Sequence, residues 1–116
     1  MKVVLVEDES MVVMLLEDML ADLGHEVVAT AGRLDRAKEC ARQADADLAV
    51  IDVNLNGEHT YEIAQTFLDR GIPIIFSTGY DAAGLDPQWR RRPLVQKPFE
   101  LSALEAAIRG ATQSQV

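Results

Sequence analysis

The sequence predicts an α/β fold in which helices cover both faces of a doubly wound, five-stranded parallel sheet of order 2-1-3-4-5, as a three-layer sandwich. Two observations predict it. Short apolar runs rich in β-branched residues recur along the chain without polar alternation, as expected for strands buried on both faces. Segments of helical periodicity separate these runs, and a strand–helix–strand unit of this kind joins parallel strands through a right-handed crossover.

Five apolar segments are the predicted strands: residues 2–6, 26–29, 48–51, 72–77 and 94–96. The clearest helix lies between the first two, where Met11, Leu15, Met19 and Leu23 recur every four residues and Gly24 stands at the expected end. Apolar stripes of helical spacing predict three further helices, over residues 33–43, 59–70 and 100–111.

The fourth crossover, residues 82–92, is predicted to be short, displaced or mobile. Gly84 and Pro87 interrupt its helical pattern, and its apolar residues are few. In this region Tyr80 and Trp89 are interpreted either as core packing or as an exposed interaction spot. The three consecutive arginines at 90–92 are interpreted either as a solvated helix end, the favoured reading, or as a docking patch for an acidic partner.

Length and composition predict one domain over residues 1–112, followed by a short flexible tail at 113–116 with no linker to a further domain. The chain has 116 residues, of which 48% are hydrophobic, enough for a single core. The net charge of −8 repels nucleic acid and anionic lipid, so direct binding to either is not expected. The single cysteine, Cys40, is expected to be a small buried hydrophobe.

The first apolar run is ended by Glu7, Asp8 and Glu9, so it is too short for a secretion signal or a membrane span. A cytoplasmic protein is therefore expected. His25 and His59 are interpreted as surface histidines, because neither follows a predicted strand.

Polar side chains stand at the carboxyl ends of four predicted strands: Glu7 and Asp8, Asp52, Thr78, and Lys97. Ligands of doubly wound sheets bind at this rim. Three clustered carboxylates repel one another, and a hard divalent cation such as Mg²⁺ is the expected neutralising partner. Lys97 and the Thr78 hydroxyl could then hold the oxygens of a transferring phosphoryl group, with Asp52 as the nucleophile that forms an acyl phosphate.

Four motifs resemble a known family. They are Val-Leu-Val-Glu-Asp-Glu at 4–9, Ala-Val-Ile-Asp-Val-Asn-Leu at 49–55, Pro-Ile-Ile-Phe-Ser-Thr-Gly at 73–79 and Lys-Pro-Phe at 97–99. In this order they resemble the receiver domains of response regulators from two-component systems, over essentially the whole chain. The resemblance implies a flavodoxin-like fold and a phosphorylated signalling domain that catalyses its own modification and is not a turnover enzyme.

The resemblance also implies roles for individual residues. Asp52 is similar to the phosphoacceptor, Asp8 to a direct Mg²⁺ ligand and Glu7 to a ligand acting through water. Asn54 would offer its backbone carbonyl to the metal, while Thr78 and Lys97 match the phosphate-sensing pair. The implied phosphodonor is a phosphohistidine on a sensor histidine kinase or a histidine phosphotransfer protein. The implied output is altered binding to a downstream protein target.

The sequence departs from the usual receiver pattern at two places. Three residues before Lys97, where receivers carry a switch aromatic, it has Leu94, so the usual coupling between threonine and aromatic ring cannot operate. Residues 76–80, Phe-Ser-Thr-Gly-Tyr, resemble the signature of the FATGUY receivers, which lack that aromatic and often stand alone. Receivers commonly carry a proline four residues after the acceptor, where this chain has Asn56 followed by Gly57, so this loop is predicted to be more pliable than usual. Together with the interrupted segment at 81–92, it suggests the hypothesis that phosphorylation orders the region of the fourth crossover.

Three other functions remain open or are disfavoured. One is a pseudo-receiver that binds proteins without phosphorylation, against which the intact site residues argue. Another is a phosphate sink or shuttle in a phosphorelay, which the sequence does not distinguish from a diffusible regulator. A phosphatase of the haloacid-dehalogenase type is disfavoured, because that family needs a second aspartate where this chain has Asn54.

Overall fold

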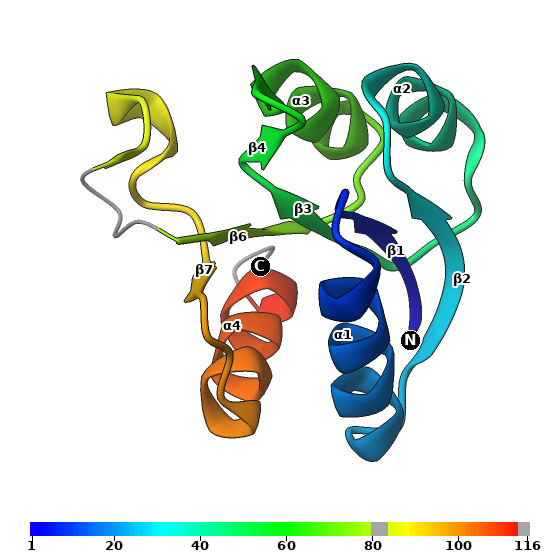
Figure 1. The fold of residues 1–116 in the computed structure, drawn as a ribbon, viewed down its shortest axis with the longest axis vertical. Coiled ribbons are helices and arrows are strands. Elements are labelled where there is room, and N and C mark those ends of the chain that lie inside the picture. The colour runs from blue at the N-terminus through cyan, green and yellow to red at the C-terminus, as the bar shows by residue number, and fades with distance from the viewer. Residues whose placement is uncertain (80–83, 114–116) are drawn as a thin grey trace.

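A five-stranded parallel sheet separates two helical layers (Figure 1). The computed structural model describes residues 1–79 and 84–113. The sheet order is β2-β1-β3-β6-β7, and β6 and β7 are its fourth and fifth strands along the chain, which confirms the predicted order. The five strands are β1 (Lys2–Val6), β2 (Glu26–Ala31), β3 (Leu48–Asp52), β6 (Ile74–Thr78) and β7 (Leu94–Gln96). The described helices are α1 (Ser10–Asp22), α2 (Leu34–Gln43), α3 (Tyr61–Asp69), α4 (Leu101–Gln113) and the 3₁₀ helix η2 (Pro87–Trp89).

The two faces of the sheet carry separate hydrophobic cores. Helices α1 and α4 cover one face, and α2 and α3 cover the other (Figure 1). Successive side chains of a strand point to opposite faces, so Val3 and Leu5 of β1 join the α1/α4 core while Val4 and Val6 join the α2/α3 core. This burial on both faces explains why the central strands read as continuous apolar runs.

The predicted elements are confirmed with shifted boundaries. Strand β2 continues to Ala31, and β6 begins at Ile74 because Ile72 belongs to the connection that follows α3. The prediction that His59 begins the third helix is wrong, since that helix starts at Tyr61. Cys40 is buried, as expected. Gln113, placed in the tail by the sequence, is the last residue of α4, and 114–116 lie outside the described residues.

The fourth crossover has little regular structure in its described part. Within residues 84–93 the structure has the three-residue helix η2 and a 3₁₀ conformation at Gly84, in line with the interruptions at Gly84 and Pro87. Leu85 and Trp89 are buried in the α2/α3 core, so the core interpretation of Trp89 is confirmed. Tyr80 lies outside the described residues.

A small hairpin after β3 was not predicted. Strands β4 (Asn54–Leu55) and β5 (Glu58–His59) pair in antiparallel fashion around a turn at Asn56 and Gly57. Both turn residues have positive φ, 52° and 86°, which is the pattern of a two-residue type I′ turn. The sequence interpretation of a pliable loop missed that an Asn-Gly pair favours this hydrogen-bonded hairpin.

Within the described residues, no helix has the length and apolar character needed to cross a membrane.

Two glycine substitutions test the backbone argument for the hairpin. Gly57→Ala should lower the free energy of unfolding by about 1 to 2 kcal/mol, because φ of 86° is unfavourable for a residue with a Cβ atom. Gly110→Ala is the control: it lies inside α4, and its added Cβ would only touch Pro93 at 4.0 Å. It should raise the stability by roughly 0.5 to 1 kcal/mol. Urea unfolding measures both, and equal effects would contradict the turn geometry.

Candidate functional site

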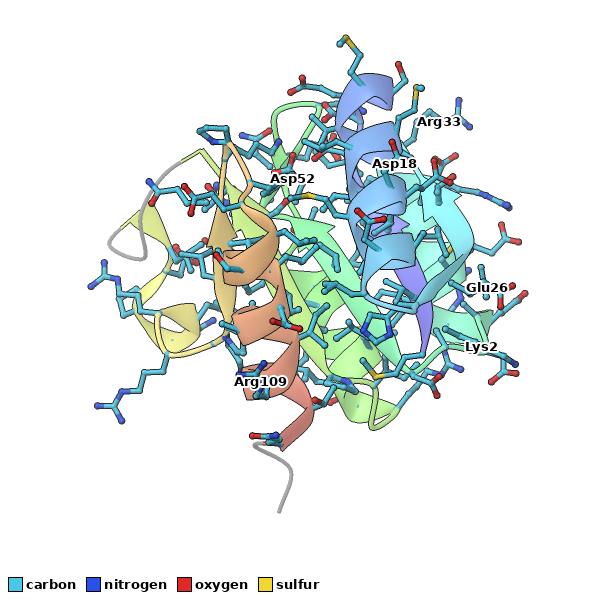
Figure 2. All side chains as sticks on the ribbon, turned by 90° about the horizontal axis from the view of Figure 1, so that it is seen from below. Lys2, Asp18, Glu26, Arg33, Asp52 and Arg109 are labelled. Carbon is cyan, nitrogen blue, oxygen red and sulfur yellow. The ribbon has the colours of Figure 1, made fainter. Side chains whose placement is uncertain are left out.

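The strand ends bring the predicted residues to one pocket. Glu7 and Asp8 follow β1, Asp52 ends β3, Thr78 ends β6 and Lys97 follows β7. The register aligns these ends, since Val6 pairs with Ile51, Asp52 with Ser77, and Thr78 with Gln96. Figure 2 shows Asp52 at the end of the sheet opposite Lys2, the start of β1. A pocket of about 350 Å³ is lined by Asp8, Glu9, Asp52, Asn54, Thr78, Gly79 and Lys97.

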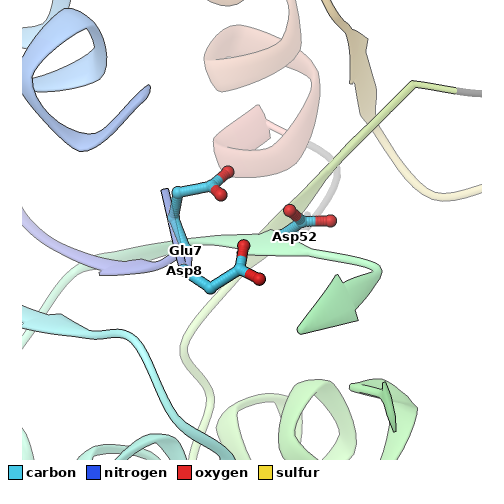
Figure 3. A group of neighbouring side chains, drawn as sticks. All are labelled: Glu7, Asp8 and Asp52. Carbon is cyan, nitrogen blue, oxygen red and sulfur yellow. The ribbon is translucent and has the colours of Figure 1, made fainter. Parts of the chain in front are cut away.

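Three carboxylates form the acidic part of this site. Glu7, Asp8 and Asp52 each place an oxygen within 4.8 Å of those of the other two (Figure 3). Glu7 and Asp52 are 3% and 6% exposed, whereas Asp8 is exposed. Two unit charges about 4 Å apart repel by about 4 kcal/mol at an effective dielectric constant of about 20. The site therefore needs positive charge.

Lys97 supplies one positive charge. Its ammonium nitrogen lies 3.0 Å from Asp52 Oδ2 and 3.1 Å from Glu7 Oε1. Its backbone N–H donates to the Thr78 carbonyl at 2.8 Å, which fixes the start of the side chain beside β6. Burial lowers the pKa of Lys97, but hydrogen bonding and charge from Asp52 and Glu7 outweigh burial, so the pKa is raised. The lysine is therefore fully charged.

Glu7 is the carboxylate that burial penalises. The pKa of Glu7 is raised to about 7, chiefly by burial and also by the negative charge of Asp52, while the Glu9 N–H and Lys97 oppose the shift. Glu7 Oε2 accepts the Glu9 N–H at 3.1 Å. Glu7 Oε1 is buried, and within the described residues it has the Lys97 ammonium nearby but accepts no hydrogen bond of good geometry. One lysine thus leaves a buried oxygen able to accept a further positive partner.

Asp52 is held from both its side chain and its main chain. Its Oδ1 accepts the Asn54 N–H at 3.0 Å, and its Oδ2 accepts a hydrogen bond from Lys97 at 3.0 Å. The Thr60 hydroxyl donates to the Asp52 carbonyl oxygen at 2.7 Å. Sequence reasoning missed Thr60, which is fully buried. The signal that could have found it is the Asn56–Gly57 turn, because a tight hairpin after β3 returns the chain to Asp52.

The β4–β5 hairpin also positions Asp8. The Asn56 N–H donates to Asp8 Oδ2 at 3.0 Å, and the Asn56 side-chain amide donates to the Gly32 carbonyl at 3.0 Å. The Asn54 side-chain oxygen accepts the Gly57 N–H at 2.8 Å, so this side chain closes the turn. The turn therefore links β1, β3 and the end of β2 at the rim of the pocket.

The donor set fits Mg²⁺. Every candidate ligand atom is an oxygen, the type that hard cations prefer, and a divalent ion with Lys97 would balance three carboxylates. The histidines are not part of this cluster. His59 is exposed in β5, and the half-buried His25 has its Nδ1 3.0 Å from the Met1 amino group.

The chain belongs to the response regulator receiver domain family, whose model matches residues 3–109. Its fold matches the solution structure of SdrG from Sphingomonas melonis Fr1, with a TM-score of 0.85, 33% identity and coverage of 95% of this chain and 94% of that one. It also matches the receiver domain of PhyR from Erythrobacter litoralis, with a TM-score of 0.79, 31% identity and coverage of 95% and 88%.

Among curated proteins, the transcriptional regulatory protein PdtaR of Mycobacterium tuberculosis is 31% identical over 111 residues, covering 92% of this chain and 54% of PdtaR. PhyR of Methylorubrum extorquens is 28% identical over 115 residues, covering 42% of that protein. The chain thus spans about half the length of the curated relatives it matches. Family members are signalling proteins, and receiver domains generally bind Mg²⁺ at an acidic pocket.

The raised pKa of Glu7 predicts a pH dependence of stability. In the metal-free protein the folded state keeps a proton on Glu7 between pH 4.5 and about 7, where the unfolded chain releases it. The stabilising contribution is therefore complete below pH 4.5 and is lost as the pH rises through about 7. Urea unfolding across this range should show the loss in the wild type and in Glu17→Gln, an exposed control on α1. Glu7→Gln should lack it, and parallel profiles for all three would contradict the assignment.

Proposed function

We propose that this chain is a response regulator receiver domain that accepts a phosphoryl group on Asp52 in a Mg²⁺-dependent reaction. The donor is a phosphohistidine of a sensor histidine kinase or a histidine phosphotransfer protein, and the output is altered binding to a downstream protein. Residues 1–112 are the proposed receiver unit, and the cytoplasm is the proposed compartment. Glu7, Asp8, Asp52 and the Asn54 carbonyl are the proposed metal ligands.

The observation that carries the proposal is the setting of the Asp52 carboxylate. It is nearly buried, each of its oxygens accepts one hydrogen bond, and it faces an open pocket that Lys97 and Thr78 also line. A structural aspartate that only paired with Lys97 would have no need of Glu7 and Asp8 beside it, because their charges oppose its own. The cluster is better explained as a site that gains a cation and then an anion.

The proposed transfer is a displacement at phosphorus. An Asp52 oxygen attacks the phosphorus, the phosphorus–nitrogen bond to the donor imidazole breaks, and the imidazole nitrogen takes the electron pair. Lys97 then pairs with a phosphoryl oxygen in place of Asp52, and the Thr78 hydroxyl donates to another. Mg²⁺ held by Glu7, Asp8, Asp52 and the Asn54 carbonyl would supply positive charge that offsets the negative charge of the site. Hydrolysis of the acyl phosphate by water would regenerate Asp52.

An exposed apolar surface on α1 supports a protein donor. Met11 is 81% exposed, Met14 63% and Leu15 44%, and Met14 lines a pocket together with Glu7 and Asp8. Exposed apolar side chains beside a polar site are typical of protein interaction surfaces. We therefore assign this part of α1 to contact with the phosphodonor.

The acceptor assignment is tested by phosphate-affinity gel electrophoresis. Incubation with acetyl phosphate and Mg²⁺ should produce a retarded band for the wild type and for Asp18→Asn, because Asp18 is an exposed residue of α1 that does not line the pocket. Asp52→Asn should produce none, because the nucleophilic carboxylate is lost while the side-chain size is kept. Omission of Mg²⁺ should remove the band from the wild type. A wild type that never shifts would favour the pseudo-receiver function.

The donor surface is tested by comparing two phosphodonors. The double variant Met11→Ala, Met14→Ala should lower the rate of transfer from the cognate phosphohistidine protein several-fold, because apolar contact area is lost. Labelling by acetyl phosphate should stay unchanged, since neither methionine lines the pocket around Asp52. Val28→Ala, an exposed apolar position on β2, is the matched control. Equal loss with both donors would argue against a docking role for α1.

A further inference from the structure

The first two residues after the hairpin, Thr60 and Tyr61, contact two different parts of the molecule. Thr60 is fully buried, and its hydroxyl donates to the carbonyl oxygens of Asp52 at 2.7 Å and Val53 at 3.2 Å. Its backbone N–H donates to the Val53 carbonyl at 3.1 Å. Thr60 precedes α3, where threonine commonly caps the helix, yet its side chain makes no capping hydrogen bond. The Thr60 hydroxyl therefore bonds to the main chain at the end of β3, where Asp52 lies, and not to the first turn of α3.

Tyr61 contacts the segment between β6 and β7. Its ring stacks on Trp89 with the centroids 5.6 Å apart and the planes inclined by 10°, and it packs edge-on against Phe76 at 5.9 Å. The Tyr61 hydroxyl oxygen accepts the Asp86 N–H at 3.0 Å. Two independent contacts, one by the ring and one by the hydroxyl, thus join α3 to the 84–93 segment.

The side chain of Trp89 is held by ring contacts and core packing. It is 5% exposed, lies edge-on to Phe76 at 5.5 Å and has the Arg92 guanidinium 5.9 Å above its ring. Its indole N–H is buried and has no hydrogen-bond acceptor among residues 1–79 and 84–113. An unsatisfied buried donor costs about 1 to 3 kcal/mol. A second conformation of the 84–93 segment, in which the indole N–H finds an acceptor, would therefore gain this free energy relative to the present one.

We propose that Thr60 and Tyr61 together transmit the state of Asp52 to the 84–93 segment. This inference rests on the proposed phosphorylation of Asp52. Leu94, at the usual switch position, has no ring, and its strand pairs it with Phe76. Tyr61 instead supplies an aromatic ring that contacts both Phe76 and Trp89.

The hydrogen bonds of Asp52 and Thr60 connect the phosphorylation state of Asp52 to Tyr61 step by step. Phosphorylation removes the negative carboxylate from Lys97 and changes what the side chain of Asp52 can accept from the Asn54 N–H. The main chain of Asp52 and Val53 adjusts, and the Thr60 hydroxyl follows because both carbonyls are its partners. Tyr61 is the next residue and the first of α3, so its ring moves against Trp89. Thr60 and Tyr61 are thus positioning residues and touch no reacting atom.

The chain carries its own reporter for this motion, because Trp89 is the single tryptophan. The experiment adds Mg²⁺ and beryllofluoride, an acyl-phosphate mimic, to the full chain. Fluorine NMR measures binding of the mimic, and Trp89 emission measures the response of the 84–93 segment. In the wild type we expect both a bound fluorine signal and a shift in emission.

Two variants separate binding from transmission. Thr60→Val keeps the side-chain shape but removes the hydroxyl, and Tyr61→Leu removes the ring. Both should keep the bound fluorine signal and lose most of the emission shift on binding. Tyr61→Phe removes only the hydrogen bond to Asp86 and should lose part of the shift, and it serves if the leucine variant does not fold.

Two controls accompany these variants. Thr66→Val makes the same change within α3, where the hydroxyl donates to the Glu62 carbonyl at 3.0 Å, and Leu94→Ala truncates the usual switch position. Both should keep the full shift. The inference is overturned if the wild type binds the mimic without an emission shift, or if the Thr60 and Tyr61 variants keep it. A wild type that does not bind beryllofluoride would overturn the proposed phosphorylation as well.

Discussion

The shared ion pair of Lys97 with Glu7 and Asp52 is the interaction on which the site depends. One ammonium lies within 3.1 Å of two nearly buried carboxylates, and a third carboxylate, that of Asp8, lies beside them. Lys97 reaches this position because β7 lies next to β6 and ends at the level of Thr78. The parallel sheet thus brings together charges from the ends of three strands, β1, β3 and β7, that are far apart in sequence. A single lysine leaves excess negative charge among the three carboxylates, and in the proposed function a bound cation would balance this excess.

The sheet and most of the site could be predicted because both follow from local pattern and strand direction. Central strands such as β3 bury both faces, which leaves an unbroken apolar run in the sequence. The residue after each run then falls at the same rim, so Asp8, Asp52 and Lys97 could be grouped without knowledge of any distance. The shift in the pKa of Glu7 could not be predicted, because it depends on burial by residues distant in sequence.

The start of the third helix, the role of Thr60 and the contacts of Tyr61 could not be predicted, because they depend on contacts that leave no periodic pattern in the sequence. The third helix begins two residues later than predicted because Glu58 and His59 pair with β4, and an Asn-Gly turn outweighs helical propensity over so short a stretch. Thr60 reads as an ordinary helix cap, and only the hairpin shows that its hydroxyl faces Asp52. The aromatic contacts of Tyr61 with Phe76 and Trp89 join three segments, so they appear only when the chain is folded.

The β4–β5 hairpin separates what must stay constant from what can vary. Asp8 is held by a main-chain N–H of Asn56, and the turn is closed through Asn54 and Gly57, whereas Glu58 and His59 present exposed side chains. Replacing the exposed side chain of Glu58 would therefore leave the main-chain contacts of the acidic pocket in place, whereas replacing His59 would also remove a ring that lies 5.3 Å from that of Tyr61.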